Sequence, residues 1–255
     1  MIPSIFLCHG GPNLVFEKND YTKFLKELGR RYTPKGIVIF TAHWESDTLA
    51  ISFRDDTYEM IYDFRGFQKE LYSFKYPAKG SIEIASSLQT KLESHGITTK
   101  KDESRGFDHG AWVVLHLMYP EANIPVVQVS VNPKLSLEEQ YKIGQSIQEL
   151  GKEDILVIGS GATVHNLATI DWEANDTKAW AMEFDSWLID KVEKKDLDSL
   201  MAFENLAPYA KLAIPRNEHL VPLFINMGSG QNKVSPKLLH RSYDYGTLSY
   251  ICLEF

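Results

Sequence analysis

The sequence contains only two cysteines, Cys8 and Cys252, among its 255 residues. Two thiols this far apart in the chain do not make the disulfide framework that stabilises small secreted domains. We therefore expect both to be buried thiols in a reducing compartment. The Asn-Asp-Thr string that begins at Asn175 is interpreted as a chance sequon for the same reason.

Basic side chains are also few: 27 stand against 34 acidic ones, which gives a net charge of -7. They form no cluster interleaved with aromatic residues, and this argues against nucleic acid as a partner. No apolar run is long enough to cross a membrane, and the start, MIPSIFLCHGG, lacks the basic region and cleavage site of a signal peptide. We expect a cytoplasmic protein with no membrane partner.

Several familiar motifs are missing as well. The sequence has no Walker A loop, and the string GSGATV at Gly159 lacks the third glycine of a dinucleotide-binding loop. Ser160 is not embedded in a G-x-S-x-G nucleophile elbow. No internal repeat, low-complexity tract or linker divides the chain, so residues 1–255 are predicted to form a single domain.

Apolar runs of strand length alternate with helical stretches along the chain. The runs at residues 5–8, 37–41, 126–131 and 155–158 are nearly uninterrupted, as is typical of strands covered on both faces. Helices are predicted at about 21–31, 82–93, 111–118, 137–150, 179–192, 196–204 and 218–224, and one or two closing strands at 234–255 with a turn at Tyr245-Gly246. This alternation predicts an α/β fold, phosphorylase/hydrolase-like, with a central mostly parallel or mixed sheet flanked by helices.

Five histidines stand in distinctive loop-like strings: His9 in LCHGGP, His43 in FTAHWES, His109 in GFDHGAW, His165 in GATVHNL and His219 in RNEHLVP. Three of them follow predicted strands, so the sheet would bring them to the edge where α/β proteins bind ligands. We expect His9 and His43 to lie on neighbouring parallel strands, about 4.8 Å apart, and to share a divalent ion. Taken singly, each is explained equally well as a turn histidine.

The two strings that do not follow a predicted strand, those of His109 and His219, indicate different chemical roles. His109 follows Asp108 at the mouth of a predicted helix, where backbone amides and the helix dipole would lower its pKa and keep it neutral as a base. A helix N-terminal residue capped by Asp108 is an equally good interpretation. His219 follows Glu218, and because adjacent helical positions point about 100° apart, only one of the two is expected to reach a metal. The other histidines are interpreted as structural: His95, His116 and His240.

The strings HGGP, AHWE, DFRGF, YPAKG, GFDHG, VHNL and EHLVPL, in this order, resemble the 4,5-DOPA extradiol dioxygenase family of bacteria and plants. That family belongs to the class III extradiol ring-cleavage dioxygenases related to protocatechuate 4,5-dioxygenase. The likeness runs from about residue 3 to residue 225. It departs from the family at HGGP, where HGSP is usual, and at Tyr62, where many members have histidine. Both departures put the substrate in doubt more than the chemistry.

The resemblance implies a role for each of the five histidines. It implies that the metal ligands are His9, His43 and His219, with Glu218 kept as an alternative because the protocatechuate relatives use a glutamate. His165 matches a histidine beside the metal that is sometimes counted among the ligands, and otherwise acts as an acid or base. His109 matches the acid/base residue of the ring-opening site.

These roles imply an extradiol dioxygenase that inserts O2 into a catechol-type aromatic diol, DOPA-like or related, and yields a muconic semialdehyde. Three protein ligands on octahedral iron(II) leave positions for the diol and for O2. A fourth ligand, His165, would favour zinc(II) instead. The alternatives are a zinc-dependent hydrolase (an amidohydrolase) using the same histidines, and a binding protein without activity; in each case we expect a monomer or homodimer.

The segment 63–80 is dense in aromatic residues and is predicted to be a packed loop over the pocket. Candidates for lining an aromatic-accepting pocket are Trp44, Phe64, Phe67, Tyr72 and Trp112.

Overall fold

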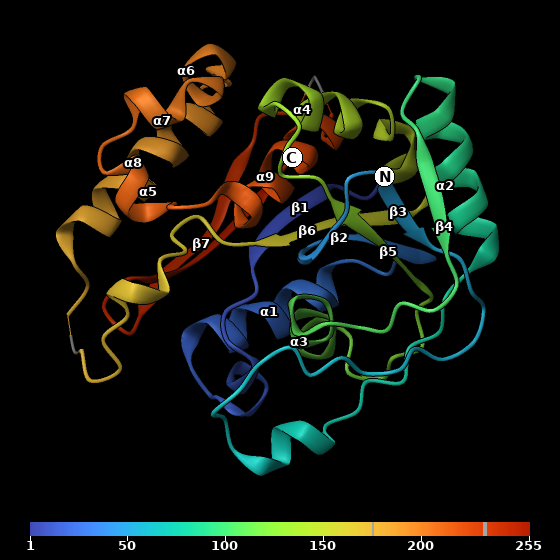
Figure 1. Ribbon diagram of the computed structural model, residues 1–255, viewed down its shortest axis with the longest axis horizontal. Coiled ribbons are helices and arrows are strands. Elements are labelled where there is room, and N and C mark those ends of the chain that lie inside the picture. Colours follow the sequence, from blue (N-terminus) through green and yellow to red (C-terminus); the bar gives the residue numbers. More distant parts are fainter. Residues whose placement is uncertain (175, 232–233) are drawn as a thin grey trace.

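The computed structural model describes residues 1–174, 176–231 and 234–255, so Asn175 of the presumed chance sequon lies outside the described residues. An eight-stranded sheet with the order β4-β3-β5-β2-β6-β1-β8-β7 runs through the centre (Figure 1). Its strands are β1 Ser4–Cys8, β2 Gly36–Glu45, β3 Leu49–Ser52, β4 Thr99–Asp102, β5 Val126–Val131, β6 Ile155–Gly161, β7 Lys237–Asp244 and β8 Leu248–Glu254.

The four central strands, β5, β2, β6 and β1, are parallel to one another. They are the four strands predicted from the apolar runs, and every residue of β1, β5 and β6 is buried because helices cover both faces. The sheet is nevertheless mixed, since β3 pairs antiparallel with β5 and β8 pairs antiparallel with β1. The predicted α/β class with a mixed sheet is confirmed.

Helices pack on both faces of the sheet (Figure 1). One buried cluster joins the sheet to α1 and α3 through residues such as Leu28 and Trp112. A second cluster on the other face joins it to α2, α4 and α9 through Leu88, Ile143 and Ile225. The α-helices are α1 Asp20–Arg31, α2 Ile82–Ser94, α3 His109–Met118, α4 Leu137–Gln145, α5 Ala179–Glu193, α6 Leu197–Met201, α7 Phe203–Leu206, α8 Ala210–Ala213 and α9 Val221–Ser229. Short 3-10 helices are η1 Pro12–Phe16, η2 Lys69–Ser73, η3 Gln148–Glu153, η4 Leu167–Thr169 and η5 Asn217–His219.

Three predicted helices are divided in the structure. The stretch 137–150 is α4 up to Gln145 and then part of η3, and 196–204 is split into α6 and α7. The stretch 218–224 begins as η5, and α9 starts only at Val221, because Pro222 favours the first turn of a helix. Strands β3 and β4 were not predicted: β4 is the short edge segment TKKD, whose charged side chains carry no apolar signal.

The chain ends in a hairpin that forms one edge of the sheet, with β7 as the outermost strand. Its strands β7 and β8 are joined at Tyr245 and Gly246, whose positive φ angles of 49° and 76° are those of a tight hairpin turn, as predicted. Strand β8 then pairs with β1, the strand that ends beside His9. Among the described residues, no helix is long and apolar enough to span a lipid bilayer.

Candidate metal centre

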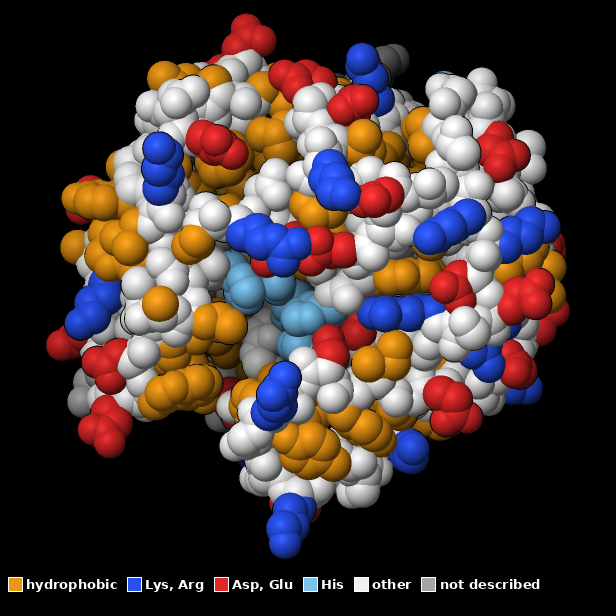
Figure 2. All heavy atoms as spheres, in the orientation of Figure 1, with side chains coloured by type: hydrophobic (Ala, Val, Ile, Leu, Met, Phe, Trp, Pro, Cys, Tyr) orange, Lys and Arg blue, Asp and Glu red, His pale blue; other side chains and the backbone are white. Residues whose placement is uncertain are grey.

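The five histidines singled out in the sequence meet at the carboxyl ends of the central strands, where Figure 2 shows histidine side chains in a hollow of the surface. His9 follows β1, His43 lies near the end of β2 and His165 follows β6. Together with His109 they line a cavity of about 380 Å³, and His219 is buried beside them in η5.

The prediction that His9 and His43 stand on neighbouring strands was wrong, because β6 lies between β1 and β2. The end of β6 is the small-residue segment Gly159-Ser160-Gly161, over which the two imidazoles reach each other. The η5 segment also lies close to β6: a Cβ atom on Gly161 would stand 2.0 Å from the carbonyl oxygen of His219. Glycine at position 161 therefore allows the segments that carry His9, His43 and His219 to approach one another.

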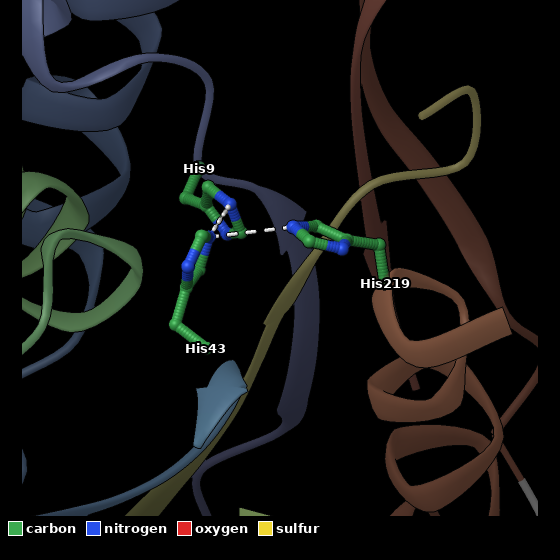
Figure 3. Close-up of side chains that lie close together, drawn as sticks. All are labelled: His9, His43 and His219. Carbon is green, nitrogen blue, oxygen red and sulfur yellow. Dashed lines mark hydrogen bonds between the residues drawn. The ribbon is translucent and has the colours of Figure 1, made fainter. Parts of the chain in front are cut away.

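Three imidazole nitrogens point at one another in this centre (Figure 3). The Nε2 atom of His43 lies 3.0 Å from Nε2 of His9 and 3.3 Å from Nε2 of His219. The three side chains come from β1, β2 and η5, so segments far apart in the chain supply one triangle of nitrogens.

The other ring nitrogen of His9 is held by β6. Its Nδ1 atom lies 3.0 Å from the hydroxyl oxygen of Ser160, and that hydroxyl donates its own proton to the carbonyl oxygen of Gly110. The hydroxyl is thus an acceptor toward His9, which must donate from Nδ1. The Nε2 atom of His9 is left with a free lone pair.

Carboxylates orient the imidazoles of His43 and His219 in the same way. Nδ1 of His43 lies 3.0 Å from Oδ2 of Asp63, and Nδ1 of His219 lies 3.0 Å from Oε1 of Glu218. A carboxylate oxygen accepts, so both imidazoles donate from Nδ1 and present Nε2 as a lone pair. Such second hydrogen bonds to oxygen are the usual way in which proteins orient metal-binding histidines.

Three lone pairs facing one another at these distances repel unless a cation lies between them, so this donor set fits a divalent metal ion. The surroundings favour the neutral form, which a metal ligand requires, for two of the three imidazoles. Burial, together with the charge of neighbouring imidazoles, lowers the pKa of His9 and of His219 well below the usual value. For His43, burial lowers the pKa, but the hydrogen bond that its Nδ1 donates to Asp63 and the negative charges of Asp108 and Asp63 together outweigh burial, and the pKa is raised.

His109 occupies the first position of α3, and Asp108 caps the helix by accepting from the amide of Ala111 at 3.1 Å, as predicted. Its Nδ1 atom lies 2.8 Å from Oδ1 of Asp63. The pKa of His109 is lowered, in the predicted direction but from another cause: burial contributes most, followed by the charge of His43.

Gly110 allows α3 to pack closely against the end of β2, the strand that carries His43. A Cβ atom on Gly110 would stand 2.7 Å from Oγ1 of Thr41 and 2.9 Å from Cδ2 of His43. Thr41 donates a hydrogen bond of 2.8 Å to Asp108, and Arg105 pairs with the same carboxylate at 2.9 Å. The start of α3 is therefore locked onto the strand that carries His43.

The imidazole of His165 lies flat against that of His219, with ring centroids 3.4 Å apart. Burial lowers the pKa of His165 to about 4. Its Nδ1 atom is 3.8 Å from Oε1 of Glu218, the same oxygen that holds His219. Glu218 thus stands behind two imidazoles, and its second oxygen, Oε2, is buried without a hydrogen bond to any described residue.

Sequence reasoning did not assign a role to Asp63, although it stands in the string DFRGF. Of the aromatic candidates, Phe64 and Phe67 line the cavity, and the segment 63–80 covers it there as predicted; Trp44, Tyr72 and Trp112 are not among the lining residues. The lining aromatic residues that the sequence did not indicate are Trp172 and Tyr245, whose rings meet at 4.8 Å. The three histidines interpreted as structural lie outside the cavity: His95, His116 and His240.

Comparison with known proteins shows the family to which the chain belongs. Residues 3–253 match the family described as the catalytic LigB subunit of aromatic ring-opening dioxygenase. The chain is 38% identical to 4,5-DOPA dioxygenase extradiol of Beta vulgaris, covering 99% of this chain and 96% of that protein. It is 32% identical to the protein of the same name from Escherichia coli K12, covering 99% and 94%. The crystal structure of an uncharacterised Escherichia coli K12 protein superposes over 100% of both chains with a TM-score of 0.86 and 28% identity. The chain therefore belongs to the extradiol aromatic ring-opening dioxygenases of the LigB family and is an oxidoreductase.

Proposed function

We propose that this protein binds iron(II) and opens the ring of a catechol-type substrate that carries a DOPA-like side chain. The observation that carries the proposal is the triangle of Nε2 atoms from His9, His43 and His219, which opens into a cavity of about 380 Å³ beside His109. A cavity of this size accepts a substituted aromatic ring. The relatives named 4,5-DOPA dioxygenase extradiol support a diol of this class.

The proposed ligands are the three Nε2 atoms, with Glu218 orienting His219 rather than binding the metal. The hydrogen bond between Oε1 of Glu218 and Nδ1 of His219 supports this division. Three protein ligands leave coordination positions open for a diol and for dioxygen. Bound iron(II) would supply the redox chemistry between the diol and dioxygen, which zinc does not offer.

His109 is the proposed base. It donates from Nδ1 to Asp63, so its Nε2 atom is free to take the proton of a phenolic hydroxyl, and its lowered pKa keeps that nitrogen unprotonated at neutral pH. His165, whose pKa of about 4 keeps it neutral, is proposed to hydrogen-bond the oxygen atoms of the substrate and to relay to the ring-opened product the proton that His109 has taken. Phe64, Phe67 and Trp172 would pack against the apolar part of the substrate and keep bulk water from the ring.

The test is reconstitution of the protein with iron(II) without oxygen, followed by addition of L-DOPA and then of air. We expect oxygen consumption and a yellow ring-fission product in proportion to the iron bound, measured by absorbance and elemental analysis. A protein that binds one iron per chain and cleaves none of a panel of substituted catechols would contradict the proposal. Hydrolysis of amide substrates by the zinc-loaded protein would favour the hydrolase alternative.

A further inference from the structure

Asp63 differs from the other residues that orient the imidazoles, because its two carboxylate oxygens hold two histidines with different proposed roles. Oδ2 accepts from Nδ1 of His43 at 3.0 Å. Oδ1 accepts from Nδ1 of His109 at 2.8 Å and from the backbone amide of His109 at 3.2 Å. By contrast, Ser160 lies against the ring of His9 alone.

The backbone holds Asp63 in this position. Residues 59–61 pair with the segment that leads into α3: the amide of Phe107 donates to the carbonyl oxygen of Glu59 at 2.8 Å, and the amide of Ile61 donates to Phe107 at 2.6 Å. Asp63 follows two residues after Ile61, as His109 follows two residues after Phe107. The backbone pairing therefore places Asp63 beside the start of α3 independently of any side-chain contact.

We propose that Asp63 is a positioning residue that sets a metal ligand and the base at once, by holding His43 and His109 as tautomers with a free Nε2. The base part of this inference rests on the proposed function. The chemistry is direct, because a carboxylate only accepts, so each imidazole that faces it must carry its proton on Nδ1. Both working nitrogens are then unprotonated, one toward the metal and one toward the substrate.

The substitution Asp63→Asn tests the inference because it keeps the shape and replaces one acceptor by a donor. An amide nitrogen facing Nδ1–H forces one imidazole to move its proton to Nε2, and the imidazole that still faces the amide oxygen loses the negative charge of its acceptor, so both metal binding and the base are weakened. We expect zinc(II) affinity to fall about 10- to 100-fold, and turnover of the fully iron-loaded variant to fall about 100-fold or more. Wild-type affinity, or wild-type turnover at full loading, would overturn the corresponding half of the inference.

Asp56→Asn is the matched control, because this carboxylate is exposed, lies in the preceding loop and pairs with Arg54. We expect both measurements to stay within about twofold of wild type. Thermal melting and circular dichroism of both variants establish that they fold. The Asp63 side chain is 22% exposed and belongs to no helix or strand.

A double-mutant cycle separates a positioning role from a merely structural one. If Asp63 acts on turnover through His109, then Asp63→Asn added to His109→Ala lowers the residual turnover by less than about twofold, while zinc(II) affinity still falls. A loss of residual turnover as large as in the wild-type background would overturn the inference.

A spectroscopic measurement is independent of ring cleavage. Long-range proton–nitrogen NMR of the zinc-loaded protein, with labelled histidine, reports which nitrogen of His109 carries the proton. We expect Nδ1–H in the wild type and its loss in Asp63→Asn; Nε2–H in the wild type would overturn the inference. If the loaded wild type cleaves no catechol, the proposed function fails, while the zinc and NMR measurements still decide the role of Asp63.

Discussion

The rings of His165 and His219 are stacked, with centroids 3.4 Å apart and an angle of 13° between their planes. The lone pair of an imidazole nitrogen lies in the plane of its ring, so the nitrogens of two stacked rings direct their lone pairs along nearly parallel planes and not toward one point. His219 and His165 would therefore not both hold the same ion in this arrangement. The stacking therefore favours proton transfer or hydrogen bonding as the role of His165.

His165→Phe tests this role, because it keeps the stacked ring and removes both nitrogens. We expect zinc(II) affinity to stay within about threefold of wild type and turnover to fall about 100-fold, measured by chelator competition and by product absorbance. Loss of bound metal in this variant would instead identify His165 as a ligand.

Replacing the base should separate metal binding from turnover. We predict that His109→Ala binds one iron(II) per chain and loses turnover by about 100-fold or more, because its Nδ1 donates to Asp63 and its ring, although 4.1 Å from that of His43, supplies no nitrogen to the Nε2 triangle. His9→Ala and His43→Ala are expected to lose both. Elemental analysis beside a cleavage assay measures this, and full activity of the His109 variant would refute the acid/base role.

Substitutions at the adjacent η5 residues Glu218 and His219 should differ in their effect on metal binding. His219→Ala is expected to abolish metal binding, whereas Glu218→Gln should weaken it only about tenfold, because the amide oxygen can still accept from Nδ1 of His219. Isothermal titration with zinc(II) compares the two variants. If Glu218→Gln binds no metal and His219→Ala does, the ligand assignment is reversed.

Arg65 lines the mouth of the cavity and forms no hydrogen bond or ion pair with residues in the described part of the chain. We predict that it pairs with the carboxylate of a DOPA-like substrate. Arg65→Gln should raise KM about fivefold for a carboxylated catechol, as an exposed ion pair of about 1 kcal/mol would, and leave KM for 4-methylcatechol unchanged. Lys69→Gln, on an exposed position of η2, is the control. Equal effects on both substrates would refute the pairing.

Asp185 provides a test of stability away from the site. It is completely buried, and burial raises its pKa from 3.8 to about 6, although the neighbouring hydroxyl groups of Thr163, Tyr243 and Ser249 act in the opposite direction. A raised pKa means that the folded state favours the protonated form. Its contribution to the unfolding free energy is therefore complete below about pH 4 and is lost as the pH rises through about 6. The expected loss is about 3 kcal/mol.

Urea unfolding between pH 4 and pH 8 measures this contribution. The free energy of unfolding of the wild type should decrease from pH 4 to pH 8, after subtraction of the pH dependence that other groups contribute. In Asp185→Asn the corresponding component should be absent. Parallel pH curves for the two proteins would show that Asp185 is not the group responsible.

The sequence predicted the features whose signal is local. The central strands appeared as apolar runs because each is covered on both faces, and the turn at Tyr245-Gly246 appeared because Gly246 adopts a positive φ angle that favours glycine. Strand order is set by packing between distant segments, so the insertion of β6 between the strands of His9 and His43 was invisible. The five histidines were found through their strings, and the structure brings all five together.

The role of Asp63 could not be found in the same way. An aspartate in a loop carries no periodic signal, and its two partners lie 20 and 46 residues away along the chain. Only the pairing of residues 59–61 with Phe107 places it between them. The helix predicted over 218–224 failed for a local reason, because Pro222 sets the start of α9 after the histidine rather than before it.

The pairing of β8 with β1 has a consequence for synthesis on the ribosome. Strand β1, which ends at the first ligand, is made early, but both of its neighbours in the sheet come from the second half of the chain, at residues 155–161 and 248–254. A nascent chain that still holds residues 248–254 in the exit tunnel can pair β1 with β6, and so hold His9 through Ser160, but it has an open edge on the other side of β1. An unpaired strand edge is a site of misassembly, so the sheet beside His9 is protected only after β8 has left the ribosome.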